Sequence, residues 1–584
     1  MHRHFRLTCS AFAILTLLSA CGGGGEQNGK PAGDATNIAI ENTGTAPPVA
    51  ATGNSPSAGG SVPGGDSAGL SNPGATAGPG SIAQASAPAA SGTPAGSTQG
   101  GNASGSPFAA ANTPGGMATT SPIATTGYTP SAGQGGTAAA VPATGCPGTL
   151  SPPSNASSLN TRAATYLGMG AQDEANAVEI DTNCSLLVGG RFTGTDFART
   201  AVDLIGGGTG GAVLRLNASG TTVLAVIRVG GLVSDLALRR ANGDMAIASD
   251  AGVVVAGADG KTVRWKHTSG GAAQRVAIAE DGHAAALFGK TLRVFDPQGQ
   301  LKFERAFGDS AVNDVAIDSA SGLVFVTGFA QRNGAPCSQL QVAWIRSYTL
   351  AGAAAWKAWD WSKDEAGAGS NCADTRGLRV AMGRDGKLYF AGESAGGNTI
   401  YRWLPTDLSK PAPNVANDSY NTEYNTASNH ITYFARLNPA TGTPEKGQLL
   451  LTRLGSGKGN SIFPRGLAAD EAGNVYVAGN AAYAIANRTS LSINGKTLAA
   501  YAGGDPFVLV VSPDFATRRL WITPADGGNG DGRAVAASGG VAALASVGRL
   551  LPFALHNSLQ SLTGGGGAAG TSTGHLMVWD GFAK

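Results

Sequence analysis

Aromatic and amide side chains are concentrated in one stretch of the sequence, residues 393–435. Flat aromatic rings offer a large contact area at a small cost in side-chain entropy, and neighbouring amides or carboxylates supply directional hydrogen bonds. This combination is typical of surfaces that bind carbohydrate or an extended peptide. The alternative is that the rings pack back onto the rest of the fold. The candidate ligand-binding residues are Tyr401, Trp403, Asn414, Asp418, Tyr420, Tyr424 and Asn429.

Three short motifs match catalytic or nucleotide-binding patterns, but each lacks the required context. GTSTG at 570–574 matches the nucleophile elbow, yet an apolar strand follows it where a helix is needed. GGGTGG at 206–211 fits a dinucleotide-binding pattern in a chain with 89 glycines, and no βαβ unit surrounds it. GSGKGNS at 455–461 lacks the first glycine and the final Ser or Thr of a phosphate-binding loop. The motifs therefore assign no catalytic residue.

Metal-binding patterns are equally weak. Beyond the N-terminal segment, histidines stand at 267, 283, 430, 556 and 575, without the spacing of metal ligands. DGGNGDG at 526–532 offers carboxylates and an amide for Ca²⁺, but it does not follow the EF-hand pattern, and a solvated turn is the alternative. No other cofactor is expected. The chain has 40 basic and 38 acidic side chains, which gives no case for nucleic-acid binding.

The first twenty residues have the pattern of a secretory signal peptide. Arg3 and Arg6 precede an apolar segment that is too short to span a bilayer. LSAC at 18–21 resembles the lipobox of bacterial lipoproteins, and the resemblance implies cleavage before Cys21 and lipidation of its thiol. An ordinary signal peptide with a nearby cysteine is the alternative. Two acyl chains anchor a protein stably to a membrane, and by the same resemblance Gly22 favours the outer membrane of the cell envelope.

Residues 22–160 are rich in Gly, Ala, Ser, Thr and Pro and carry little charge. Such a composition buries too little apolar surface to offset the entropy lost on ordering, so it predicts a disordered linker. A flexible chain of this length spans on the order of 60 Å. The predicted organisation is a signal peptide at 1–20, a lipidated cysteine with its linker at 21–160, and a folded region at 161–584.

The folded region contains a repeated hairpin. GLAADEAGNVYVAGN at 466–480 consists of two short apolar strands joined by a tight turn. The same pattern begins near residues 176, 233, 274, 312, 376 and 533. Self-similarity on this scale indicates a repeat architecture, which also explains how so long a region can fold as one domain.

Two further strands follow six of the seven hairpins, and four strands per unit are typical of a β-propeller blade. The seventh unit has only one further strand, HLMVWDG, whereas TRAATYLG at 161–168 precedes the first hairpin. We therefore predict an all-β, seven-bladed β-propeller. Its N-terminal strand completes the last blade and closes the ring, so that no sheet edge is left open.

Units one and six carry additional elements in a fixed order, including FTGTDF and GGAVLRLNASG in unit one and INGKTLAAYAGGDPFVLVVSPD in unit six. This order resembles the bacterial β-propeller repeat of the SBBP type, and units four and five match it in their hairpins. Units two and three lack the Phe-x-Gly and Gly-Gly-x-Asp-x-Phe elements, so six or eight blades remain alternatives. The resemblance implies a fold and no particular activity.

The loops of such a blade fall into two classes, one on each face of the ring. The first-to-second and third-to-fourth turns are short, and the insertions occur in the other class. Long loops on one face of a rigid scaffold are where binding usually resides. We predict a crescent of insertions from units four to seven and unit one. The insertions are residues 191–211, 329–340, 362–375, 393–429, 480–505 and 548–573.

Four cysteines follow the lipobox, and an even number in an exported chain is expected to form disulfides. Cys146 and Cys184 belong near the short-turn face, and Cys337 and Cys372 fall in segments of the long-loop face. We therefore predict the pairs 146–184 and 337–372. Free buried thiols are the alternative.

The favoured function is a monomeric, lipid-anchored and surface-displayed propeller that binds a glycan or a protein through its long loops. A polysaccharide-active or oxidoreductase enzyme on the same scaffold and a structural envelope protein are the alternatives. An enzyme would need an acid and a base near the central channel, where such groups also serve to fasten neighbouring blades. The candidates there are Asp173, Glu174, Asp235, Asp314, Asp374 and Arg376.

Overall fold

The computed structural model describes residues 146, 150–168, 170–193, 201–206, 210–414, 430–450, 452–453, 459–561 and 571–582. The predicted signal peptide, Cys21 and most of the predicted linker lie outside these residues. The described part is all-β apart from the short helix α1 (Lys363–Ala368) and brief 3-10 turns. No helix in this part is long and apolar enough to cross a membrane.

Seven antiparallel sheets of four main strands follow one another along the chain, and we number them 1 to 7. Sheet 1 also carries a short fifth strand, β5 (Ala201–Asp203). From innermost to outermost strand, sheet 1 consists of β3 (Glu174–Ile180), β4 (Leu186–Arg191), β6 (Gly211–Leu216) and β7 (Val223–Arg228). Sheet 2 consists of β8 (Val233–Leu238), β9 (Met245–Ser249), β10 (Gly252–Ala256) and β11 (Val263–His267). Sheet 3 consists of β12 (Arg275–Ile278), β13 (Ala284–Phe288), β14 (Thr291–Phe295) and β15 (Leu301–Ala306).

The remaining sheets repeat this order, with more residues between their second and third strands in sheets 5 to 7. Sheet 4 consists of β16 (Ala311–Asp318), β17 (Leu323–Asn333), β18 (Gln339–Thr349) and β19 (Ala354–Trp359), and sheet 5 of β20 (Thr375–Met382), β21 (Leu388–Ser394), β24 (Ile431–Leu437) and β25 (Pro444–Leu450). Sheet 6 consists of β28 (Ile462–Ala469), β29 (Val475–Ala481), β32 (Asp505–Val511) and β33 (Arg518–Ile522). Sheet 7 consists of β34 (Asn529–Ser538), β35 (Val541–Leu550), β36 (Thr573–Asp580) and β2 (Thr161–Leu167).

Sheet 7 joins the two ends of the folded region, as the sequence predicted. Its outermost strand is β2, which pairs antiparallel with β36 from Thr161 opposite Trp579 to Leu167 opposite Gly574. All seven residues of β2 are buried. The strand that comes first in the sequence is therefore a full member of the last sheet.

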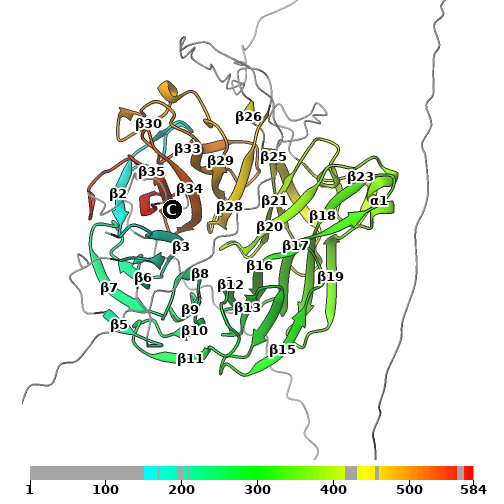
Figure 1. The fold of residues 1–584 in the computed structure, drawn as a ribbon, viewed down its shortest axis with the longest axis horizontal. Helices are drawn as coiled ribbons and strands as arrows, with labels where there is room; N and C mark the ends of the chain where they lie inside the picture. The colour runs from blue at the N-terminus through cyan, green and yellow to red at the C-terminus, as the bar shows by residue number, and fades with distance from the viewer. Residues whose placement is uncertain are drawn as a thin grey trace, which may run out of the picture. The chain divides into compact units, whose positions relative to one another are not determined.

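The innermost strands contact one another in chain order. β3 contacts β8, and the series continues through β12, β16, β20, β28 and β34, which in turn contacts β3. Figure 1 shows the sheets arranged around a common centre. The arrangement is propeller-like, as expected from four-stranded repeats.

The core lies between neighbouring sheets, because each sheet buries apolar side chains on both of its faces. The middle strands β9 and β13 are buried along their whole length. The rings of Trp344, Trp359 and Trp579 are also fully buried. Inner strands approach closely where the residues are small. A Cβ at Gly466 in β28, for example, would lie 2.9 Å from the Cα of Ala534 in β34.

The described parts of several insertions run along the outermost strands of their sheets. β5 pairs in parallel with β7, Asn414 forms a bridge with Gly447 in β25, and His556 forms a bridge with Ala164 in β2. In sheet 6 the Trp521 amide of β33 donates to Ala156, just before β1 (Ser158–Leu159), and β1 pairs with β30 (Ser492–Ile493) of the insertion. The predicted insertions thus leave the sheets at the end opposite the short turns, and parts of them also cover outer sheet edges, which the sequence did not predict.

Candidate functional site

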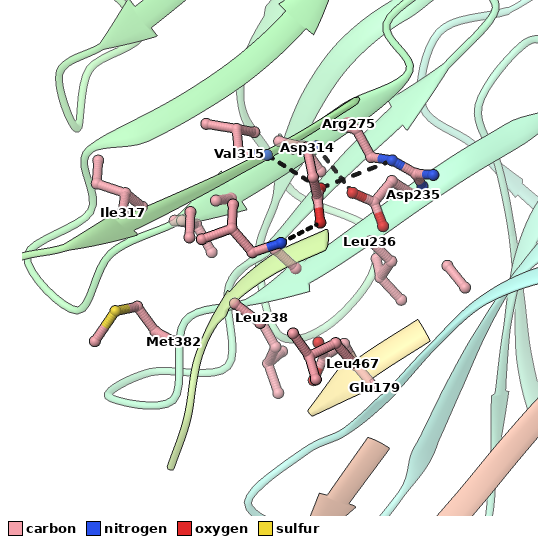
Figure 2. A pocket seen from close by; sticks show the side chains of 18 of the residues that line it. Glu179, Asp235, Leu236, Leu238, Arg275, Asp314, Val315, Ile317, Met382 and Leu467 are labelled. Carbon is pink, nitrogen blue, oxygen red and sulfur yellow. Dashed lines mark hydrogen bonds and ion pairs between the residues drawn. The ribbon is translucent and has the colours of Figure 1, made fainter. Parts of the chain in front are cut away.

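A cavity of about 250 Å³ lies where the seven innermost strands face one another. It is lined by residues from β3, β8, β12, β16, β20, β28 and β34. Figure 2 shows Asp235, Arg275 and Asp314 grouped in its wall, with Glu179 further along. Because seven sheets contribute to one small space, equivalent positions of the repeat meet there.

A β-bulge interrupts six of the seven innermost strands. The extra residue redirects side chains locally, and bulges are common beside functional sites. Three of the extra residues, Asn176, Arg465 and Arg533, line the cavity. The register shifts fall between Ala175 and Ala177, Val233 and Asp235, Val312 and Asp314, Gly377 and Arg379, Pro464 and Gly466, and Gly532 and Ala534.

Charges alternate along one wall of the cavity, from Asp235 to Arg275, Asp314 and Arg379. Oδ1 of Asp314 lies 3.7 Å from Nε of Arg275, and its Oδ2 lies 3.8 Å from Nη1 of Arg379. The amide of Val380 donates to Asp314 at 3.1 Å, and that of Val276 donates to Asp235 at 3.0 Å. Burial raises the pKa of the Asp314 carboxyl, although both arginines oppose this. Each aspartate thus links its own sheet to the next.

The other predicted acid and base candidates are also engaged within the fold. Asp173 accepts hydrogen bonds from the Thr193 amide at 2.8 Å and its hydroxyl at 2.7 Å. Asp374 accepts from the Gln341 amide at 2.8 Å, and Glu174 accepts from the Asn176 side chain at 3.3 Å. Only the Asp374 contact joins neighbouring sheets, which is the fastening role that the sequence left as an alternative to catalysis; the contacts of Asp173 and Glu174 lie within sheet 1.

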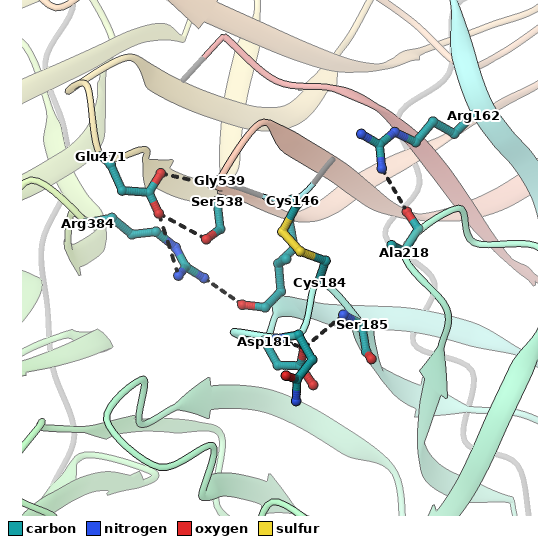
Figure 3. Close-up of a disulfide and its surroundings, with 12 residues drawn as sticks. Cys146, Arg162, Asp181, Cys184, Ser185, Ala218, Arg384, Glu471, Ser538 and Gly539 are labelled. Atoms are coloured by element: carbon teal, nitrogen blue, oxygen red, sulfur yellow. Dashed lines mark hydrogen bonds and ion pairs between the residues drawn. A yellow bond between two sulfur atoms is a disulfide. The ribbon is translucent and has the colours of Figure 1, made fainter. Parts of the chain in front are cut away.

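Arg384, in the turn after β20, reaches residues of two other sheets directly and those of a third through Glu471. Its Nη2 donates to the Ile180 carbonyl at 2.8 Å and lies 3.6 Å from Oε2 of Glu179, both in β3. Its Nη1 lies 4.0 Å from Glu471, whose carboxylate accepts from Ser538 and Gly539 (Figure 3). Burial raises the pKa of Glu179 to about 7, against the attraction of Arg384. Arg384 therefore crosses the short-turn end of the cavity.

The predicted aromatic surface at 393–435 is only partly present among the described residues. Tyr401 is fully buried, and its ring stacks on Tyr433 with centroids 4.4 Å apart. Its assignment as a surface ligand residue is therefore wrong, because the ring belongs to the core between sheets 4 and 5. Asn414 donates from Nδ2 to the Tyr401 carbonyl at 2.8 Å, and the Tyr433 hydroxyl donates to its Oδ1 at 3.3 Å. These bonds hold the loop to the sheet.

Trp403 is half-buried and donates from Nε1 to Asn371 at 2.8 Å. It thus remains a partly exposed aromatic ring at this edge. The other candidates, Asp418, Tyr420, Tyr424 and Asn429, lie outside the described residues. Their assignment stays a prediction.

A charged cluster lies where the insertion of sheet 5 leaves and re-enters the sheet. Glu393 of β21 is 4% exposed and pairs with Arg376 of β20, and its Oε2 lies 3.2 Å from Nδ1 of His430. Burial alone would raise the pKa of the Glu393 carboxyl, but His430 and Arg376 lower it below its usual value. The cluster fixes the two ends of the 395–430 connection.

The two disulfides pair as the sequence predicted. Cys146 is bonded to Cys184 in the turn after β3, and Cys337 is bonded to Cys372. The second bond joins the β17–β18 connection to the segment that follows α1. Figure 3 shows the first bond near Asp181 and Arg384.

The carboxylates of segment 526–532 are engaged by cationic side chains. Asp526 accepts from Lys496 Nζ at 2.6 Å and from the Ala499 amide at 2.8 Å. Asp531 lies 3.1 Å from Arg533 and 2.7 Å from Arg549. In the described part of the chain, no three His, Cys, Asp or Glu residues are grouped as metal ligands. Calcium binding at this segment stays a prediction.

Four arginines of the cavity were not predicted from the sequence. Arg275, Arg379, Arg465 and Arg533 occupy similar places in QRVAI, LRVAM, PRGLAA and GRAVAA. They stand at two adjacent positions of the repeat: Arg275 and Arg379 are paired residues of their strands, and Arg465 and Arg533 are the extra residues one position earlier. A comparison of the repeats at these two positions would have shown four arginines near the cavity. The bulges that orient Arg465 and Arg533 leave no comparable pattern in the sequence.

Comparison with known proteins supports the repeat. Residues 451–482, which include β28 and β29, match the SBBP beta-propeller repeat model. A structure of Kuenenia stuttgartiensis hydrazine synthase aligns with a TM-score of 0.37 and 10% identity, over 64% of this chain and 93% of that chain. No protein of curated function gave a significant sequence match.

Proposed function

We infer that the repeat at 451–482 is one unit of seven, and we propose a lipid-anchored, seven-bladed β-propeller that binds a glycan or a protein at the cell envelope. Cys21 carries the lipid in this proposal, and residues 22–160 form the tether to an outer membrane. The seven four-stranded sheets and the pairing of β2 with β36 support a ring closed by its N-terminal strand. The protein acts as a monomer.

The observation that carries the binding role is the asymmetry of the connections. At one end of the sheets the turns are short, as in residues 181–185 and 279–283. At the other end, sheet 5 inserts residues 395–430 between β21 and β24. A rigid scaffold that concentrates long connections at one end is the usual arrangement of a binding protein.

Sheet 5 is the best-supported place for the ligand. The cluster of Glu393, Arg376 and His430 holds the base of the insertion, and Trp403 of the same insertion is half-buried. Aromatic faces with polar neighbours suit a glycan or an extended peptide. The aspartates at the cavity are occupied by bonds between sheets, which supports binding over catalysis.

The test is binding of the mature chain, with Cys21→Ser to keep it unlipidated, to immobilised bacterial and host polysaccharides, peptidoglycan and surface proteins. The variant replaces 415–429 with a Gly-Ser linker of equal length. It leaves Asn414 and the cluster at Glu393 in place, so the bonds that anchor the insertion to the sheet are kept. A matched control replaces 562–570 in the same way.

We expect saturable binding by the parent and by the 562–570 control, and at least a tenfold loss in the 415–429 variant. Circular dichroism and thermal unfolding would confirm that all three are folded. Equal binding by the parent and both variants would mean that residues 415–429 of the sheet 5 insertion do not form the binding site. Absence of saturable binding to every member of the panel would contradict the binding role.

A further inference from the structure

The cavity contains more cationic groups than its carboxylates neutralise. Six arginines line it, together with five acidic residues. Arg240 pairs with Glu280 at 3.0 Å, and Arg384 lies 3.6 Å from Glu179. Arg275 and Arg379 share Asp314, at 3.7 and 3.8 Å. The arginines not yet accounted for are Arg465 of β28 and Arg533 of β34.

Arg465 is the least neutralised of these side chains. It is exposed within the cavity, and no described carboxylate lies within ion-pair distance of it. Arg533 shares Asp531 with Arg549, and its buried Nε has no hydrogen-bond partner among the described residues. The charge of Arg465 also lowers the pKa of Arg379 and of Arg533, after the larger effect of their burial. The charge of Arg465 therefore acts on both of the other guanidinium groups, and all three residues line one cavity.

The wall beside these arginines is formed by small residues. Gly466 and Ala534 follow Arg465 and Arg533 directly, and Ala177 follows Asn176 at the matching position of β3. β28 and β34 approach so closely at Gly466 that a Cβ there would lie 2.9 Å from the Cα of Ala534, so no larger residue fits. These small side chains and the two arginines line the same cavity.

Access is set by Arg384, which crosses the short-turn end. Arg465 and Arg533 lie near the middle of their strands, and the starts of these strands, at the end away from Arg384, face the connections between sheets. A ligand would enter from that end. Planar guanidinium groups bind carboxylate and phosphate oxygens through paired hydrogen bonds, and such bonds are strongest where water is excluded.

We propose that Arg379, Arg465 and Arg533 form a binding site for a small oxyanion-bearing molecule, about the size of one sugar unit, in the central cavity. The anionic group is a carboxylate or a phosphate. The cavity volume of about 250 Å³ limits the bound part to this size. The site is separate from the one proposed on sheet 5 and does not depend on it.

The test is calorimetric titration of the full mature chain, unlipidated through Cys21→Ser, at low ionic strength. The probes are glucuronate, glucose 6-phosphate, inorganic phosphate and, as the neutral reference, glucose. The variants are Arg465→Gln and Arg533→Gln. Lys302→Gln removes one positive charge from exposed β15 and serves as the matched control.

We expect at least one anion to bind saturably and glucose not to bind. Arg465→Gln should weaken anion binding at least tenfold, while Lys302→Gln leaves it unchanged. Binding of glucuronate alone identifies a carboxylate site, binding of the phosphates alone identifies a phosphate site, and binding of both supports a general oxyanion site. The proposal is overturned if no anion binds, or if Arg465→Gln and Lys302→Gln weaken binding equally.

Arg465→Gln provides the decisive variant even if Arg533→Gln fails to fold, because Arg465 is exposed and outside the ion-pair network. Thermal unfolding with and without the anion gives a second readout. A bound anion should raise the midpoint of the parent and not that of Arg465→Gln. Loss of this difference would count against the site independently of the calorimetry.

Discussion

Sheets 2 and 3 differ from sheets 5, 6 and 7 in how their outer strands are protected. Among the described residues, sheets 2 and 3 end in β11 and β15, with no further strand or bridge beside them. Most residues of β15 are exposed, and they include Lys302, Glu304 and Arg305. In sheet 7, by contrast, the outermost strand β2 is buried throughout and bonded to His556.

The difference shows two ways in which this protein protects the unpaired outer edges of its sheets. A bare strand edge invites pairing with another chain, and proteins prevent it either by placing charges on the edge or by covering it. Sheets 2 and 3 have short connections and rely on charge. Sheets 1, 5 and 7 use parts of their long insertions as covers, through β5, Asn414 and His556. In sheet 6 the segment at Ala156 bonds the outer strand, and β30 of the insertion pairs with the neighbouring β1. The insertions thus contribute to stability as well as to any binding role.

The largest expected effect comes from breaking the ion pair that holds the insertion of sheet 6. Asp505 and Arg488 lie 2.5 Å apart, with side chains 0% and 8% exposed. Asp505→Asn leaves the arginine buried without its counter-charge, so we expect a loss of about 3–5 kcal/mol in the free energy of unfolding. Chemical denaturation at neutral pH measures it.

The matching change in sheet 3 is Glu304→Gln, because Glu304 pairs with Arg293 at 2.6 Å on an exposed edge. Exposed pairs are typically worth about 1 kcal/mol or less. Similar losses in the two variants would remove the energetic distinction between the covered and the bare sheets.

A smaller effect is expected from the buried histidine of sheet 7. His575 is 0% exposed, and its Nε2 lies 3.0 Å from the Ala554 carbonyl of the insertion. Burial lowers its pKa from 6.5 to about 4, against the opposing effect of this hydrogen bond. Between these values the unfolded chain binds the proton and the folded chain does not, so the free energy of unfolding falls as the pH drops from 6.5 to 4.

His575→Gln should remove this contribution and flatten the dependence of stability on pH in that window. Denaturation midpoints of the parent and the variant, measured at several pH values, would show this change as a difference between the two proteins. The contributions of the other titrating groups are the same in both proteins and cancel in that difference. His283→Gln, in a turn of sheet 3, is the control. An unchanged slope in His575→Gln would mean that the buried ring does not resist protonation.

The smallest effect on stability is expected at the bare edge itself. Lys302→Val with Glu304→Val on β15 should change the free energy of unfolding by roughly 1 kcal/mol or less, because both residues are exposed. Removal of the edge charges should nevertheless increase self-association, measured by light scattering of the folded protein.

Glu445→Val with Lys446→Val on β25 removes the same pair of charges from an edge that Asn414 covers. At equal concentration of folded protein, this control should scatter less light than the variant with Lys302→Val and Glu304→Val. The edge interpretation would be abandoned if both pairs of substitutions increased scattering alike.

The sequence was informative where local pattern decides structure. Alternating apolar strands and Asp-Gly turns identified the hairpins, and counting strands showed that residues 161–168 must complete the last sheet. The cysteine pairs followed from the placement of the turns. These features depend on short stretches of chain or on the order of strands.

The sequence was less informative where distant side chains meet. Tyr401 has the composition expected of a surface loop, but it stacks on Tyr433, about thirty residues away in sequence, and this contact depends on tertiary packing. The edge-covering role of the insertions depends on backbone pairing such as that of His556 with Ala164, which no side-chain pattern encodes. Arg465 and Arg533 are oriented by bulges, which arise from the register of two paired strands.

The Cys146–Cys184 disulfide has a mechanical consequence. A pull on the chain from its N-terminal side reaches Cys146 first, and the bond passes that force to Cys184 in the turn after β3. Residues 150–160 and the strand β2 lie beyond this point in the chain. The tension passes through covalent bonds into sheet 1, so a pull from the N-terminal side does not peel β2 directly from sheet 7.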